Sequence, residues 1–270
     1  MTWTSELRPN EPVLDAGSAT PVTPQGYSTG YVPRDYESRP VGYHKAGAPA
    51  YGKGVLIPRS EWDDRIAEKE KNKSRISDIL DAAAVPSTDQ NGTNYCWFFG
   101  VVGACQARRA VAGLPYVALS PACGAAQIKG FRNQGGWGAD AVEWMVEHGV
   151  CSTDLWPQAA ISRKYLTDEA TAQAATFKLA EWDDIEEYDF DALMSELLQP
   201  DPIPCALGLD WWGHLIFACD GVKLGTGKYG VRIRNSWGAD YGDNGYAILE
   251  ERKARGDAYG IRVMSATDYA

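Results

Sequence analysis

The sequence predicts an α+β fold with two lobes, because helical patterns come first along the chain and strand patterns follow. Helical patterns dominate from about residue 90 to residue 198, and short β-rich runs separated by Gly, Asp and Asn dominate from residue 205 onward. Helices and strands that are segregated in this way favour α+β over an alternating α/β sheet. Closely spaced β-rich runs are typical of an antiparallel sheet or barrel. We therefore expect a helical lobe over about residues 90–165 and a β-barrel-like lobe over about residues 176–265.

The clearest predicted helix covers residues 96–112, CWFFGVVGACQARRAVA. It is apolar almost all round, which is typical of a helix buried in a core. Gly113 follows it and is a suitable residue to end it. Further helices are expected at 121–131, 139–148, 163–176 and 191–198.

Five strands are expected in the second half of the chain. They are the apolar runs CALGLD, HLIFACDGV, YGVRIRN, YAILEE and YGIRVMS, which begin at residues 205, 214, 229, 246 and 259. Turn-forming residues separate each run from the next, as in a sheet of antiparallel neighbours.

Residues 1–54 differ in composition from residues 55–270, which we expect to form the main domain. This arm holds seven of the 15 prolines, seven glycines and five of the 14 tyrosines, with five acidic and five basic residues. A stretch interrupted so often by Pro and Gly cannot build its own core. We expect an arm that lies on the domain or on a neighbouring subunit; a loosely ordered tail is the alternative.

Charge and cysteine usage exclude several classes of function. The formal net charge is -10 and the pI is near 4.8, which argues against a nucleic-acid partner. No apolar run is long enough to span a membrane, and MTWTSELRPNEP lacks the pattern of a secretory signal. The six cysteines form no CxxC pair and have no zinc-ligand spacing, so we expect no metal, no cofactor and six reduced thiols. We expect a cytoplasmic or other reducing compartment.

Three residues can supply thiol chemistry. Cys96 lies at the first turn of the predicted buried helix, whose positive end lowers a thiol pKa and favours the thiolate. A histidine can serve as its base, and the chain has three: His44, His148 and His214. His214 begins an apolar strand, where a histidine taken alone is more often a core residue than a catalyst. Asn235 can orient that ring through its other nitrogen, as in Cys-His-Asn arrangements.

Three separate motifs make the chain resemble the papain/cathepsin family of cysteine peptidases. QNGTNYCWFF at residues 90–99 resembles the family's nucleophile segment, and RNSWGADYGDNGYAIL at 234–249 resembles the segment with the orienting asparagine. GGWGADAVEWMVEHGV at 135–150 resembles the Gly-Gly substrate-binding turn and its helix. The match covers about residues 55–265 and implies a papain-like two-lobe fold with a cleft between the lobes.

The resemblance implies a role for each matching position. Gln90 and the backbone N–H of Cys96 would bind the oxyanion of the tetrahedral intermediate. Gly135 and Gly136 would pair with an extended substrate. The remaining positions are aromatic or apolar: Trp97 and Trp237 are structural neighbours of the catalytic groups, and Trp137, Trp212 and Leu215 would line the pocket for the second residue before the cleaved bond, favouring a bulky apolar side chain.

The chain also departs from the family. Thr93 and Asn133 stand where secreted members carry a disulfide, which fits a reducing compartment. Gly213 lies between Trp212 and His214, and Tyr95 stands where a small residue is common. The arm lacks a long helical pro-region, so it is expected either to lie in the cleft as an inhibitor or to tether the enzyme to a protein assembly such as a virus particle.

The resemblance implies a cysteine endopeptidase that cleaves polypeptides through an acyl-enzyme on Cys96, with His214 as base and acid. Two alternatives remain open. One is a related thiol amidase or isopeptidase; the other is a catalytically silent structural protein, such as a virion component, that keeps the fold.

Overall fold

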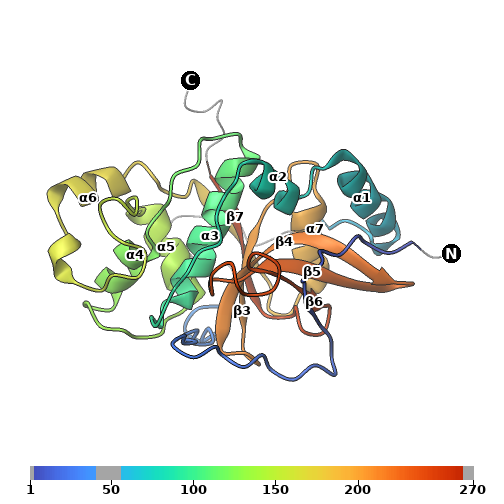
Figure 1. The fold of residues 1–270 in the computed structure, drawn as a ribbon, viewed down its shortest axis with the longest axis horizontal. Coiled ribbons are helices and arrows are strands. Elements are labelled where there is room, and N and C mark those ends of the chain that lie inside the picture. Colours follow the sequence, from blue (N-terminus) through green and yellow to red (C-terminus); the bar gives the residue numbers. More distant parts are fainter. Residues whose placement is uncertain (1–2, 41–55, 264–270) are drawn as a thin grey trace.

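Two lobes make up the part of the chain that the computed structural model describes, residues 3–40 and 56–263. Figure 1 shows a group of helices on one side and a twisted sheet on the other, with the long helix α3 (Cys96–Val111) between them. This arrangement confirms the predicted α+β class and the papain-like two-lobe fold.

Helix α3 is the central element because it packs directly on strand β4 (His214–Gly225). Its close approach depends on two glycines: a Cβ on Gly100 would lie 2.3 Å from Leu215, and one on Gly103 would lie 2.8 Å from the ring of Phe217. Burial of every residue from Cys96 to Arg108 agrees with the apolar sequence of this helix.

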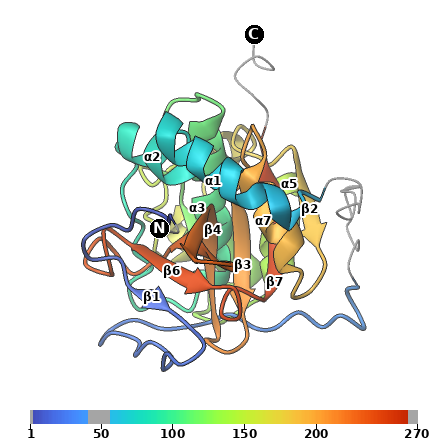
Figure 2. The same ribbon diagram turned by 90° about the vertical axis from the view of Figure 1, so that its right-hand side faces the viewer.

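The other helices cover the two lobes. The helical lobe contains α4 (Pro121–Ile128) and α5 (Gly138–Glu147), which pack against α3, and then the short 3-10 helix η2 (Arg163–Tyr165) and α6 (Asp168–Ala174). Figure 1 shows α6 at the outer end of this lobe. On the sheet lobe lie α1 (Arg59–Asn72), α2 (Ile76–Ala82) and α7 (Phe190–Leu198), as Figure 2 shows from the side.

The sheet has the strand order β1-β6-β5-β4-β3-β7-β2. Its strands besides β4 are β1 (Val13–Leu14), β2 (Glu181–Ile185), β3 (Cys205–Leu209), β5 (Lys228–Arg234), β6 (Tyr246–Glu250) and β7 (Asp257–Arg262). All neighbours pair antiparallel except β1 and β6, which are parallel. A short turn joins β3 to β4, so that Leu209 pairs with His214.

Several elements differ from the sequence prediction. Residues 163–176 form η2 and α6 instead of one helix, because Ser162 and Thr167 each cap a separate start. Helices α1 and α2 and strands β1 and β2 were not predicted. Helix α1, RSEWDDRIAEKEKN, is mostly charged and buries only Trp62, Ile66 and Lys69, so its apolar stripe is too thin to recognise. Strand β2, EWDDI, is rich in acidic residues, which are depleted in strands.

The N-terminal arm follows the domain in three stretches. Residues 3–14 lie along the sheet and end in β1; residues 15–26 are mostly exposed; residues 27–36 run to the junction of the lobes. In Figure 1 the arm is the blue chain that crosses below β3 and the lower end of α3. None of the helices within the described residues is long and apolar enough to cross a membrane.

Candidate active site

Cys96 is the first residue of α3 and is fully buried. Tyr95, at the N-cap, has the non-helical φ of -99° that lets the chain enter the helix there. The sulfur accepts a hydrogen bond from the backbone N–H of Gly30 in the arm, at 3.1 Å. The predicted placement of a cysteine at the tip of a buried helix is therefore present, and the arm lies directly on it.

His214 is the first residue of β4, and its ring is held by Asn235. Nε2 lies 2.7 Å from the Asn235 side-chain oxygen, and Asn235 itself follows the last residue of β5. The backbone N–H of Asn235 donates to Gly245 O at 2.8 Å, which fixes the position of that residue. Within the described part of the chain the other ring nitrogen, Nδ1, has no hydrogen-bond partner, so it is the nitrogen that can exchange a proton.

Cys96 and His214 come together because α3 packs on the start of β4. The backbone N–H of Leu215, next to His214, is one of the groups that lower the pKa of Cys96. Two successive arm residues touch both catalytic elements: Gly30 N–H donates to the Cys96 sulfur, and Tyr31 N–H donates to Gly213 O at 3.1 Å. The structure thus places Cys96 next to the start of β4, where His214 lies.

Burial sets the protonation of this pair. It raises the pKa of Cys96 to about 11 against the lowering effect of nearby N–H groups, and it lowers the pKa of His214 to about 4 despite the hydrogen bond to Asn235. The thiolate–imidazolium pair expected from the sequence is therefore not the favoured form in this arm-covered state. The physical reason is exclusion of water, which disfavours both charges.

Gln90 is buried beside Cys96 and held from both ends of its amide. Its oxygen accepts from Ser236 Oγ at 2.7 Å, while its nitrogen donates to Thr93 O at 2.8 Å and to Ser28 O at 2.7 Å. Ser28 belongs to the arm. Its carbonyl takes the hydrogen bond that the resemblance assigns to a substrate oxyanion.

Aromatic rings cover the His214–Asn235 bond. Trp237 stacks on His214 with ring centroids 4.8 Å apart, and Trp212 meets both rings edge-on at 5.0 and 5.5 Å. Trp97 lies behind the Gly-Gly turn, since a Cβ on Gly136 would come within 2.6 Å of its ring. These contacts are compatible with the structural roles predicted for Trp97 and Trp237.

The arm pairs with the Gly-Gly turn in a defined direction. Gly136 N–H donates to Gly30 O at 2.9 Å and Gly136 O accepts from Val32 N–H at 3.0 Å, so Tyr31 and Gly136 form a parallel bridge. Along the arm, Ser28 lies at Gln90 and Tyr31 lies at Gly136. A substrate whose acyl side occupies the predicted pocket runs the other way, with its N-terminal part at Gly136.

Tyr31, which is 6% exposed, lies at the predicted pocket: its backbone bridges Gly136, and its N–H donates to the carbonyl of Gly213, next to Trp212. Leu215 is fully buried and Trp212 nearly so, whereas Trp137 is half-buried with Arg39 stacked over its ring at 5.2 Å. Sequence reasoning missed Gly208, whose Cβ would meet the Tyr31 ring at 2.4 Å. It also missed Asp257 and Tyr259 as site residues, because the run YGIRVMS predicts a strand there but no motif marks that strand as the neighbour of β3.

Other predicted positions lie elsewhere. His148 is exposed at the C-cap of α5 beside Trp144, and His44 lies outside the described residues. At the positions of the family disulfide, the Asn133 side chain accepts from Asn94 N–H at 2.7 Å and donates to Gly92 O at 3.1 Å. All six cysteines are in the described region and all are free thiols, and no cluster of metal-ligating side chains occurs within that region.

A buried cysteine at a helix start, a histidine on the facing strand and an asparagine behind it define a thiol hydrolase. The family model described as papain family cysteine protease matches residues 77–268. The chain belongs to this family and is a cysteine protease.

Solved structures with the same fold come from several organisms. Xylellain, a cysteine protease from Xylella fastidiosa, is 17% identical with a TM-score of 0.60, over 92% of this chain and 99% of that one. Digestive procathepsin L2 from Tenebrio molitor larval midgut is 16% identical with a TM-score of 0.59, over 89% and 81%. The bromelain protease from Ananas comosus, in complex with the E64 inhibitor, is 19% identical with a TM-score of 0.56, over 69% and 97%.

Proposed function

We propose that the chain is an endopeptidase whose catalytic group is Cys96, His214, Asn235 and Gln90, and that its own arm holds it inactive. Cys96 Sγ attacks the carbonyl carbon of the scissile peptide bond, and His214 Nδ1 carries the thiol proton to the leaving amine. Water then hydrolyses the resulting thioester, with His214 as base, and releases the carboxylate product. Asn235 keeps the ring in the required tautomer.

Oxyanion stabilisation follows from Gln90 and the start of α3. The Gln90 amide and the Cys96 N–H provide two donors for the oxygen of the tetrahedral intermediate. The Gln90 side chain is aimed by Ser236 Oγ, so its NH₂ group is held toward the cleft before substrate binds.

The observation that carries the inhibitory role is the occupation of all three substrate positions by one stretch of the arm. Ser28 O takes the Gln90 amide, Gly30 N–H bonds the nucleophile, and Gly30 and Val32 use both backbone groups of Gly136. The arm runs opposite to the direction expected of a substrate. Its peptide bond at Cys96 is therefore not oriented for attack by the sulfur. The arm thus blocks substrate without being a good substrate itself.

Gly30→Ala tests the inhibitory role. A Cβ on Gly30 would lie 2.1 Å from Asn94 O, a backbone atom, so the arm cannot seat without displacing the loop before Cys96. Overpacking of this kind costs about 1–3 kcal/mol, so the fraction of open enzyme, and with it kcat/KM, should rise about 5- to 100-fold. The measurement is hydrolysis of a fluorogenic peptide by the full-length chain.

Gly17→Ala is the matched control, because its Cβ would meet only Asp15 Oδ1 at 3.5 Å in an exposed part of the arm. It should leave the rate unchanged. Cys96→Ala in the Gly30→Ala background should abolish hydrolysis. An unchanged rate in Gly30→Ala would favour the alternative role of the arm, a tether to a protein assembly.

A reducing compartment is the location we propose for this activity. Its support is the set of six free thiols and the hydrogen bonds of Asn133, which join the same two segments that a disulfide joins in secreted members.

A further inference from the structure

We infer that the pocket occupied by Tyr31 ends at the carboxylate of Asp257 and selects a substrate with arginine or lysine two residues before the cleaved bond. This inference rests on the proposed function, because it names the substrate class of the same site. It differs from the preference for a bulky apolar residue that the resemblance implies.

The floor of the pocket is a glycine that opens the way to β7. The Tyr31 ring lies on Gly208, where any side chain would collide with it. Gly208 pairs with Asp257 across strands β3 and β7. The phenol end of Tyr31 therefore points toward β7, and Asp257 is the first of the charged groups that act on it.

Asp257 is a buried carboxylate, and two of its polar partners come from the arm. Arg34 Nη1 lies 3.6 Å from Asp257 Oδ1, and Tyr36 OH donates to the same oxygen at 3.0 Å. Tyr259, from the domain, donates to the other oxygen. Arg34 also binds Asp184 in a two-pronged ion pair at 2.7 and 2.9 Å.

The arm thus places an aromatic ring in the pocket and a guanidinium at its acidic end. When the arm leaves, Tyr31, Arg34 and Tyr36 leave together, and Asp257 keeps Tyr259 as the partner from the domain. A buried carboxylate without a cation is unfavourable, so a substrate cation that reaches it is favoured. The Tyr31 hydroxyl is buried and has no hydrogen-bond partner within the described residues. An extended arginine is slightly longer than a tyrosine, so its guanidinium can extend past the end of the phenol to Asp257.

The apolar lining does not oppose this choice. Arginine and lysine bury long methylene stems against apolar surface while their charged ends reach a polar group. Leu215 and Trp212 would contact the stem and Asp257 the charged end. The apolar lining predicted from the sequence and the acidic end of the pocket would therefore contact different parts of the same substrate side chain.

The test compares two peptides that are identical except for arginine or citrulline at the second position before the cleaved bond. Citrulline keeps the shape of arginine and lacks its charge. Full-length enzyme can be used, because closure by the arm lowers kcat/KM equally for both peptides and cancels in their ratio. We expect a ratio of about ten in favour of arginine, the difference between a charge-assisted and a neutral hydrogen bond.

Asp257→Asn should reduce this ratio to about two or less. Asp210→Asn is the control: Asp210 also raises the pKa of Tyr31 but is exposed at the β3–β4 turn, so the ratio should persist. A ratio near one in the wild-type enzyme, or a ratio unaffected by Asp257→Asn, would overturn the inference. The wild-type ratio decides even if the Asn variant fails to fold.

The two proposals fail in different ways. Equal cleavage of both peptides would contradict only the selection of a basic side chain by Asp257 and would leave the proposed function intact. If neither peptide is cleaved, and the Gly30→Ala variant does not cleave a peptide with leucine at that position either, the proposed function is overturned together with this inference.

Discussion

At the scale of single residues, the site shows how strongly a covering segment can change the protonation of the proposed catalytic pair. Cys96 and His214 have the neighbours that a thiol protease needs, yet both are fully buried and both favour their neutral forms. Their chemistry therefore depends on access to water, and access depends on Gly30, which has no side chain to hold the arm away from Asn94.

Asp257 gives a pH dependence of stability with a defined sign. Burial raises its pKa from 3.8 to about 6, so the folded chain binds its proton more tightly than the unfolded chain does. Stability from this group is present below pH 3.8 and is lost as pH rises to 6, up to about 3 kcal/mol. Asp257→Asn should thus gain stability relative to wild type by up to this amount between pH 4 and pH 7.

Urea unfolding of both proteins at the two pH values measures the effect. A difference between the proteins that is the same at pH 4 and pH 7 would contradict the account of Asp257, because only an ionising group makes the difference change with pH.

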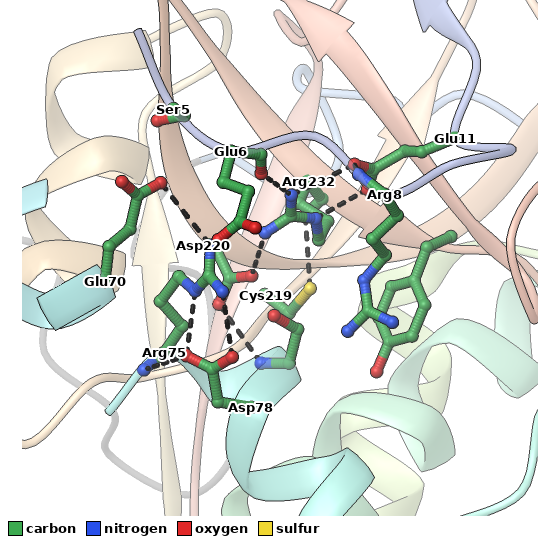
Figure 3. A network of polar contacts seen from close by, with 12 residues as sticks. Ser5, Glu6, Arg8, Glu11, Glu70, Arg75, Asp78, Cys219, Asp220 and Arg232 are labelled. Atoms are coloured by element: carbon green, nitrogen blue, oxygen red, sulfur yellow. Dashed lines mark hydrogen bonds and ion pairs between the residues drawn. The ribbon is translucent and has the colours of Figure 1, made fainter. Parts of the chain in front are cut away.

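At the scale of elements, a buried ion cluster joins the arm to the sheet. Arg232 on β5 binds Glu11 of the arm and Asp220 of β4, with side chains at most 2% exposed (Figure 3). Its Nε lies 2.5 Å from Glu11 Oε1 and its Nη1 lies 3.0 Å from Asp220 Oδ2. Two carboxylates, one from the arm and one from β4, share this single guanidinium, so the arm contributes part of the compensation of a buried charge.

Glu11→Ala should destabilise the chain by about 1.5–3 kcal/mol, because it removes two charge-assisted hydrogen bonds from a buried guanidinium that keeps Asp220 as its counter-charge. Glu6→Ala is the matched control: the Glu6 side chain is 79% exposed, and Arg232 uses only its backbone oxygen, so about 0.5 kcal/mol or less is expected. Chemical denaturation of the two variants gives both numbers. Equal effects would mean that the cluster does not anchor the arm.

The elements also show what could be predicted from the sequence. Helix α3 and strands β3 to β7 were recognisable because each carries a local pattern, and Cys96, Asn235 and Gln90 lie in motifs attached to them. Arg34, Tyr31 and Asp257 were not recognisable as a group, because they meet only when a segment without periodicity folds back over 200 residues of chain. Long-range contacts of a Pro- and Gly-rich arm leave no local signal.

At the scale of the whole molecule, the arm is attached in two places with an exposed stretch between them. Residues 3–14 are held by β1 pairing, by Ser5 bonds to Lys223 and by Glu11, while residues 27–36 fill the cleft. Val22, between the two, is 89% exposed. Cutting this stretch therefore separates two segments that are each bound to the domain.

A specific protease site inserted at Val22 tests this arrangement. After cleavage, the fragment that contains residues 1–22 should co-elute with the rest of the chain in gel filtration at micromolar concentration. Peptide hydrolysis should not increase, because residues 27–36 remain continuous with the domain. Separate elution, or a gain in rate on cleavage alone, would contradict two independent attachments.

Strand β1 has one more consequence. It pairs with Ile248 and Leu249 of β6 and supplies Pro12 O to the Ile248 N–H at 2.8 Å, at the end of the strand order. An uncovered border strand offers its free amide and carbonyl groups to other molecules and promotes aggregation. A form of the enzyme that kept the first fourteen residues and lost only residues 27–36 would be both active and soluble. Complete removal of the arm would also relieve inhibition, but it would expose β6 and promote self-association.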